Sequence, residues 1–260
     1  MTDIEPVINA LQESGPVAAS TVAGLWAAKR VAGPALDVLG KRLGDFTAVR
    51  LENLARIFEK AEDVRPDARG YPHPRVANRV LNDASLYDDD VMQTYTAGLI
   101  AGSRNDDGSD DRPVYYLGLM DSLTASQLSL FHVLYAAAAP LGPPTGNRAH
   151  DPAGLRVAVH LSEVKKAISR ISPAGASLAK RSRYLTETTT ALHVAGLIRD
   201  DGSDKTDGRH PLQTYWITRV GMLLYDWAHG FNDEDLWEFY DRDRTAIDLP
   251  DLEFKSARVV

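Results

Sequence analysis

The chain has 260 residues, of which 44% are hydrophobic and 25% charged, a composition typical of a globular protein with one large or two modest domains. It contains no cysteine, which excludes disulfides, thiolate zinc sites and a cysteine nucleophile, and its net charge of −7 disfavours nucleic-acid binding over the whole surface. The acidic start of the sequence is unlike a secretion signal, so we expect a cytoplasmic protein.

The first expected region, residues 1–44, is rich in small residues and contains a nearly uncharged run. This run is shorter than the ~20 apolar residues that a membrane span needs. Ala19, Ala23 and Ala27 lie four apart, a spacing that allows two helices to approach closely. We therefore expect a helix buried in the bundle or in a homo-oligomer interface, with contact to a membrane surface as the alternative. The candidate contact residues for either role are Val22, Leu25, Trp26, Lys29 and Arg30.

Residues 45–120 have the apolar spacing of a helical bundle. Apolar residues recur every three or four positions, which predicts helices over 45–63, 75–84, 91–101 and about 114–120. The third of these helices follows three consecutive aspartates. Consecutive carboxylates at a helix start point in different directions, so we interpret them as capping and not as a metal site.

No motif of the sequence indicates an active site. The polar loop at 106–111 lacks the alternating aspartates and the final glutamate of a calcium loop. No two of the seven histidines are four residues apart, and no nucleophile elbow, phosphate-binding loop or dinucleotide fingerprint is present. We expect no catalytic, metal-binding or cofactor-binding residue, no cofactor and no small-molecule substrate.

Residues 121–230 have the element order of a winged helix. Thr124 is expected to cap a first helix, a second helix follows, and a third ends at Gly196, which is placed for a left-handed C-cap. A polar, Gly-rich tip leads to a strand at 215–218, and Thr218 caps a further helix. The expected fold class is therefore mainly α: an N-terminal helical bundle followed by a winged-helix-like domain with one two-stranded β-wing.

The expected strand at 215–218 is followed, after one further helix, by an acidic C-terminal region at residues 231–260. Either Trp216 or Ile217 should be deeply buried, because successive side chains of a strand point to opposite faces. Helical spacing predicts a final helix over 234–243, and the tail after it is expected to be extended or disordered.

Charge is distributed unevenly along the chain. Residues 161–199 hold seven basic and two acidic residues, whereas 226–253 hold ten acidic residues and two arginines, and 81–111 hold eight acidic residues and one arginine. The basic segment fits either a nucleic acid or the acidic segments of its own chain or of a partner subunit. Glu187 shares a helical face with Arg183 and opposes contact with phosphate. The candidate nucleic-acid or partner contacts are Lys165, Lys166, Lys180, Arg181, Arg183 and Tyr184.

Four segments of the chain follow the pattern of a known family. They are the helix RLENLARI, the acidic run LNDASLYDDD, the helix TYTAGLIA and the helix start LMDSLT, at residues 50–57, 81–90, 94–101 and 119–124. Together they resemble the Abi-alpha family, abortive-infection proteins of bacteria. Tyr95 stands where tryptophan is common in that family, and Ala125 stands where proline is. The resemblance covers roughly residues 36–221 and implies a role in defence against phage, with no catalytic residues to carry over.

The residues and the resemblance together predict a non-enzymatic antiphage defence (abortive infection) protein that binds a phage or host component. The alternatives are a winged-helix DNA-binding transcriptional regulator and a membrane-perturbing defence effector. Expected partners are a protein or a second copy of this chain in a homo-oligomer, with nucleic acid and a membrane surface as candidates. The expected location is the cytoplasm, with membrane association on activation as a further alternative. The expected domains are residues 1–44, 45–120, 121–230 and 231–260.

Overall fold

A computed structural model describes most of the chain from residue 48 onward. The described residues are 48–66, 68–143, 152–160, 177–200, 205–207, 210–232, 236–241 and 257–259. The expectations for residues 1–44, including the contacts around Trp26, fall outside them. So do the second expected helix with Lys165 and Lys166, and residues 201–204 and 208 of the expected polar tip. The described part is mainly helical with a small antiparallel sheet.

The chain divides into two compact units, which are treated separately below. Unit 1 takes the residues up to Asp121 together with Trp227–Asn232, and unit 2 takes Ser122–Asp226 and the residues from Asp233 onward. No helix in the described residues is both long enough and apolar enough to cross a bilayer.

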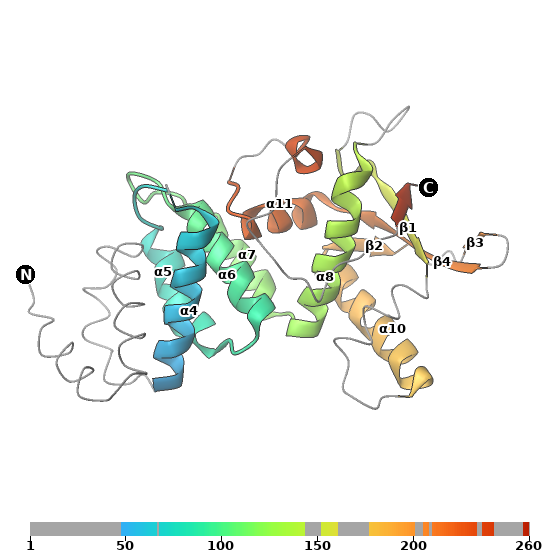
Figure 1. The fold of residues 1–260 in the computed structure, drawn as a ribbon, viewed down its shortest axis with the longest axis horizontal. Coiled ribbons are helices and arrows are strands. Elements are labelled where there is room, and N and C mark those ends of the chain that lie inside the picture. Colours follow the sequence, from blue (N-terminus) through green and yellow to red (C-terminus); the bar gives the residue numbers. More distant parts are fainter. Residues whose placement is uncertain are drawn as a thin grey trace, which may run out of the picture. The chain divides into compact units, whose positions relative to one another are not determined.

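Unit 1 is a bundle of helices, drawn in blue to green in Figure 1. Its elements are α4 (Ala48–Val64), α5 (Pro74–Asn82), the 3-10 turn η2 (Ala84–Leu86), α6 (Asp90–Ser103) and α7 (Pro113–Asp121). The four helices predicted from the spacing of apolar residues are confirmed, with their ends shifted by a few residues. Helix α6 packs against α4, α5 and α7, and every residue of α6 after Asp90 is buried.

Within the run of three aspartates at the start of α6, Asp89 caps the helix, in agreement with the capping interpretation. The Asp89 carboxylate accepts hydrogen bonds from the backbone N–H groups of Val91, at 2.9 Å, and Met92, at 3.3 Å. Asp90 lies in the first helical turn and pairs with Lys60 of α4 at 2.8 Å. A carboxylate at this helix end satisfies N–H groups that have no partner within the helix, so the acidic run has a structural role.

Small residues let other backbone approach α6 closely. A Cβ atom added at Gly98 would lie 1.8 Å from the carbonyl oxygen of Ala228, and one added at Gly102 would lie 2.8 Å from the Trp227 ring. Trp227 is almost fully buried against Tyr116, and the guanidinium of Arg112 lies 5.3 Å from its ring centroid. The glycines of α6 are therefore required by the packing of the Trp227–Asn232 segment inside unit 1.

Unit 2 combines helices with the sheet. Its elements are α8 (Ala125–Ala138), η3 (Ala139–Leu141), η5 (Pro152–Gly154), β1 (Arg156–His160), α10 (Leu178–Val194), β2 (Ile198–Asp200), β3 (Lys205–Asp207), β4 (His210–Ile217), α11 (Arg219–Ala228), η6 (Glu238–Tyr240) and β5 (Ala257–Val259). The last two residues of α11 belong to unit 1. Thr124 caps α8 as predicted, in a capping box with Gln127.

The sheet is larger than the two-stranded wing that the sequence predicted. Among the described residues its strand order is β2-β4-β1-β5, with β3 paired to β4 as well, and all pairs are antiparallel. Strand β1 was missed because its five residues pair with a strand more than fifty residues later in the chain. So short a run of alternating side chains carries little local signal of its own.

The helix predicted over 234–243 is not present in the described part of that segment. Residues 236–241 form a turn and the short 3-10 helix η6. Leu236 and Phe239 are buried while Trp237 is exposed, and a spacing of three suits a 3-10 turn as well as an α-helix. The apolar pattern located the buried side chains correctly but not the type of helix.

The packing of α6 can be tested with two glycines at interior helix positions. Gly98→Ala should lower the free energy of unfolding by about 1–3 kcal/mol, because the added Cβ overlaps the Ala228 carbonyl. Gly118→Ala in α7 should leave stability unchanged or raise it by up to about 1 kcal/mol, since its nearest neighbour would be 3.6 Å away. Chemical denaturation of both variants measures the difference. Equal effects would contradict the close approach at Gly98.

A buried histidine predicts a pH dependence of stability. Burial lowers the pKa of His132 from 6.5 to about 4, and its ring lies 5.6 Å from that of Tyr225. Between pH 6.5 and pH 4 this imidazole is protonated in the unfolded chain and neutral in the folded chain. The free energy of unfolding is therefore highest above pH 6.5 and decreases as the pH falls towards 4. Relative to His132→Gln, the wild type should lose up to about 3 kcal/mol over this range. Denaturation at several pH values measures it, and parallel curves would contradict the neutral state.

Candidate functional site

The hydroxyl of Tyr135, near the C-terminal end of α8, joins this helix to the start of β2 and to the turn between β4 and α11. This buried hydroxyl donates to the carbonyl of Leu197 at 2.6 Å and accepts from the backbone N–H of Thr218 at 3.0 Å. Leu197 precedes β2, and Thr218 separates β4 from α11. One side chain thus fixes where the chain enters β2 and where it leaves β4. Burial of the phenol raises the pKa of Tyr135, so the group remains a donor.

Thr218 completes this junction with its own side chain. Its hydroxyl lies 2.7 Å from the Gly196 carbonyl and 3.1 Å from the Leu197 carbonyl, and it accepts from the N–H of Gly221 at 3.1 Å. Thr218 therefore caps α11, as the sequence predicted. Position 221 has space only for glycine, because a Cβ atom added there would lie 1.9 Å from the Tyr135 hydroxyl oxygen.

Helix α10 ends at Gly196 in the left-handed conformation that the sequence predicted. Gly196 has a φ of +72°, a region in which side chains other than glycine are strained. The N–H of Leu197 bonds to the carbonyl of Leu192, and that of Gly196 to the carbonyl of His193, both at 2.9 Å. This pair of bonds is the Schellman motif. It reverses the chain directly into β2.

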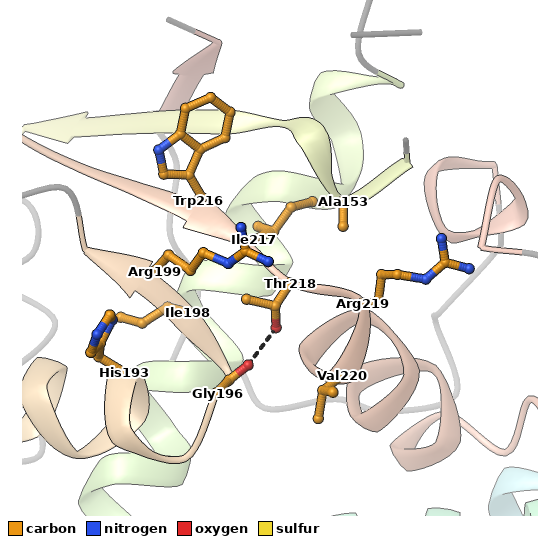
Figure 2. Close-up of a pocket in the computed structure, with 10 residues that line it drawn as sticks. All are labelled: Ala153, His193, Gly196, Ile198, Arg199, Trp216, Ile217, Thr218, Arg219 and Val220. Atoms are coloured by element: carbon orange, nitrogen blue, oxygen red, sulfur yellow. Dashed lines mark hydrogen bonds between the residues drawn. The ribbon is translucent and has the colours of Figure 1, made fainter. Parts of the chain in front are cut away.

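A pocket of about 700 Å³ lies beside this junction. It is open to solvent and is shown in Figure 2. Its lining residues come from η5, the end of α10, the first residues of β2, the end of β4 and the start of α11, and they are Ala153, His193, Gly196, Ile198, Arg199, Trp216, Ile217, Thr218, Arg219 and Val220. None of these ten residues is acidic, and two are arginines. The described lining therefore carries two positive charges within an acidic chain.

The sheet places an aromatic side chain between two arginines. Trp216 in β4 is directly opposite Arg199 of β2 and Arg156 of β1. Residues opposite each other in antiparallel strands project from the same face, so the three side chains form a row. The guanidinium of Arg156 lies 5.9 Å from the Trp216 ring centroid, within cation–π range.

The neighbouring positions of the same strands face the opposite way and are buried. Ile198, Tyr215 and Ile217 are each exposed by no more than 2%. The Tyr215 hydroxyl donates to the Leu134 carbonyl of α8 at 2.9 Å, and burial raises its pKa. Trp216 itself is half-buried. The expectation that Trp216 or Ile217 is deeply buried is thus confirmed by Ile217, and Trp216 lies on the pocket side.

The predicted contact surface on α10 is brought together only in part. Lys180 and Arg183 are exposed and one helical turn apart, and Tyr184 is half-buried. Arg183 forms an ion pair with Glu187 at 2.8 Å, as expected for charges four residues apart. The side chain of Arg181 is outside the described residues. Two cations and one carboxylate therefore define the described part of this surface.

None of the ten lining residues was predicted as a site residue. Arg199 was counted only as a member of the basic segment, and His193 was interpreted as a packing residue. The register of β2 against β4 puts Arg199 beside Trp216, and that register is not encoded in local sequence. An arginine and a tryptophan at matching positions of two predicted strands is the signal that could have identified the pair. Within the described residues, no group of histidine, aspartate and glutamate has an arrangement that could hold a metal ion.

The comparisons with known proteins identify no relative. No protein-family model, no curated protein and no solved structure matches the chain.

The Tyr135 junction predicts a specific loss of stability. Tyr135→Phe removes the hydroxyl and leaves the buried N–H of Thr218 without this acceptor, which should lower the free energy of unfolding by about 1–3 kcal/mol. Tyr115→Phe, at a side chain that is 57% exposed, is the matched control and should change stability by less than about 0.5 kcal/mol. Urea denaturation compares the two. If Tyr135→Phe behaved like the control, the hydroxyl would not hold the junction.

Proposed function

We propose that unit 2 contains a winged-helix module and that the protein acts by binding through it. The observation that carries this proposal is the sheet order. Strand β4 pairs with β2 on one side and with β1 on the other, and α8 precedes β1 while α10 directly precedes β2. Strand β3 pairs with the first residues of β4, at the end of that strand away from β2, and so lengthens the hairpin as a wing does. Few arrangements of so few elements share this order.

In this module α10 occupies the place of the recognition helix. It is the last helix before the hairpin, and its buried side is defined by Leu185, Thr188 and Leu192. The opposite side presents Lys180 and Arg183 to solvent. In helix-turn-helix proteins the N-terminal residues of this helix contact base edges or phosphates. A partner of the module would therefore meet these two cations first.

The biological role that we propose is non-enzymatic antiphage defence of the abortive-infection type, exerted by binding a phage or host component. The support is the resemblance of residues 50–57, 81–90, 94–101 and 119–124 to the Abi-alpha family, together with the winged-helix order of unit 2. Winged helices bind nucleic acid or protein, so the fold by itself does not name the partner. A cytoplasmic location and self-association are parts of the same proposal.

A second candidate function is DNA binding as a transcriptional regulator. The exposed pair Lys180 and Arg183 on α10 favours it. The ion pair between Arg183 and Glu187 opposes it, because a phosphate would have to replace the carboxylate and would be repelled by it. Exposed pairs of this kind contribute at most about 1 kcal/mol, so exchange for a phosphate is accessible.

The two candidates are separated by a double variant of α10. Lys180→Ala with Arg183→Ala should abolish phage protection in a bacterial challenge if the module binds its target through this helix. For a DNA-binding protein it should also weaken DNA binding in gel shifts and lower the salt slope by about 0.9 per lost phosphate contact.

The matched control is Arg56→Ala on α4, where Arg56 and Glu52 form an exposed ion pair of the same spacing. This control should keep both protection and binding. Protection that survives the double variant would rule out α10 as the functional surface. Absence of DNA binding by the intact protein would rule out the regulator while leaving the defence proposal standing.

A further inference from the structure

We propose that the pocket between α10, β2, β4 and α11 binds a nucleotide, with the base against Trp216 and the phosphate held by Arg199 and Arg219. This site is additional to the α10 surface of the proposed function. His193, at the end of α10, lies thirteen residues from Lys180, which is roughly 20 Å along a helix. The two sites can therefore be tested independently.

The aromatic side of the pocket is Trp216. It is half-buried, and its position in β4 is fixed by pairing with both neighbouring strands. Arg156 lies 5.9 Å from the ring centroid and donates towards the Thr214 hydroxyl at 3.4 Å, which holds a cation beside the indole. A held indole that lines an open pocket offers a stacking surface for a planar base.

The cationic side consists of Arg199 and Arg219. Both side chains are exposed and both line the pocket, and Figure 2 shows Thr218 between them. Their backbone positions are fixed on either side of the Tyr135 junction, since Arg199 follows Leu197 by two residues and Arg219 follows Thr218 directly. Two guanidinium groups on one pocket suit an oxyanion, because the fork geometry of arginine matches phosphate.

The size of the pocket favours a nucleotide over other phosphate-bearing ligands. A volume of about 700 Å³ is within the range for small-molecule sites and exceeds what an inorganic ion needs. An aromatic wall next to two arginines matches a ligand in which a planar ring and a phosphate are held a few bonds apart. The base and phosphate could belong to a free mononucleotide or to a single-stranded nucleic acid.

The test is titration calorimetry of the full chain with defined probes. The probes are AMP, ATP, adenosine, inorganic phosphate and single-stranded oligonucleotides of about ten nucleotides. Binding of AMP or ATP, with weaker binding of adenosine and of phosphate, supports a free nucleotide as ligand. Binding of the oligonucleotides alone supports the same contacts to a single strand. If neither nucleotides nor oligonucleotides bind with a Kd below about 1 mM, the proposal is wrong.

Variants locate the binding. Arg199→Ala and Trp216→Leu should each weaken it at least about tenfold, with the arginine variant reducing its salt dependence. Arg56→Ala, at an exposed arginine on α4 of unit 1, is the matched control and should leave nucleotide affinity unchanged. Circular dichroism checks that Trp216→Leu is folded, and Arg199, being exposed, provides the second variant if it is not. Affinity that resists both pocket variants, or that falls equally in the control, would overturn the assignment.

Discussion

The hydroxyl of Tyr135 is the contact on which the arrangement of unit 2 depends. It is fully buried, and it bonds to one backbone group before β2 and to another after β4. Two segments separated by some twenty residues are thereby tied to the same helix, α8. The ring packs against Phe131 and Tyr225, so hydroxyl and ring fix position and orientation together. A buried polar group is costly unless it is satisfied, and here it satisfies two partners at once.

This junction also explains why two different surfaces arise from one hairpin. Gly196 reverses the chain at the end of α10, so β2 starts with its first residue, Ile198, turned inward. The strict alternation of strand side chains then places Arg199 on the outer side, beside Trp216. A shift by a single residue in the register would bury the arginine and expose the isoleucine. The chemistry of the pocket therefore follows from the cap of α10 and from the Thr218 contacts.

Features set by local spacing were predictable from the sequence, and features set by pairing over long distances were not. The helices of unit 1, the Asp89 cap, the Thr124 cap and the turn at Gly196 each depend on residues within about one helical turn, and each is confirmed. Strands β1 and β5 owe their existence to partners far along the chain, and the sequence indicated only a two-stranded wing. The pocket belongs to the second class, because Arg199 and Trp216 meet only through the register of β2 and β4.

The basic residues of segment 161–199 are distributed between helix α10 and the sheet. The basic segment 161–199 suggested one electropositive surface, but on α10 the pair Arg183 and Glu187 is already neutralised. Among the described side chains of this segment, the remaining positive charges are Lys180 on α10 and Arg199 in the pocket, where Arg199 is joined by Arg219 from outside the segment. In a chain with a net charge of −7, long-range attraction of a polyanion is weak, and an anionic ligand must be captured by cations at short range. A small phosphate-bearing ligand satisfies that condition with two guanidinium contacts. A DNA duplex carries many phosphates, and those beyond the two arginines would be repelled by the acidic residues of the rest of the chain.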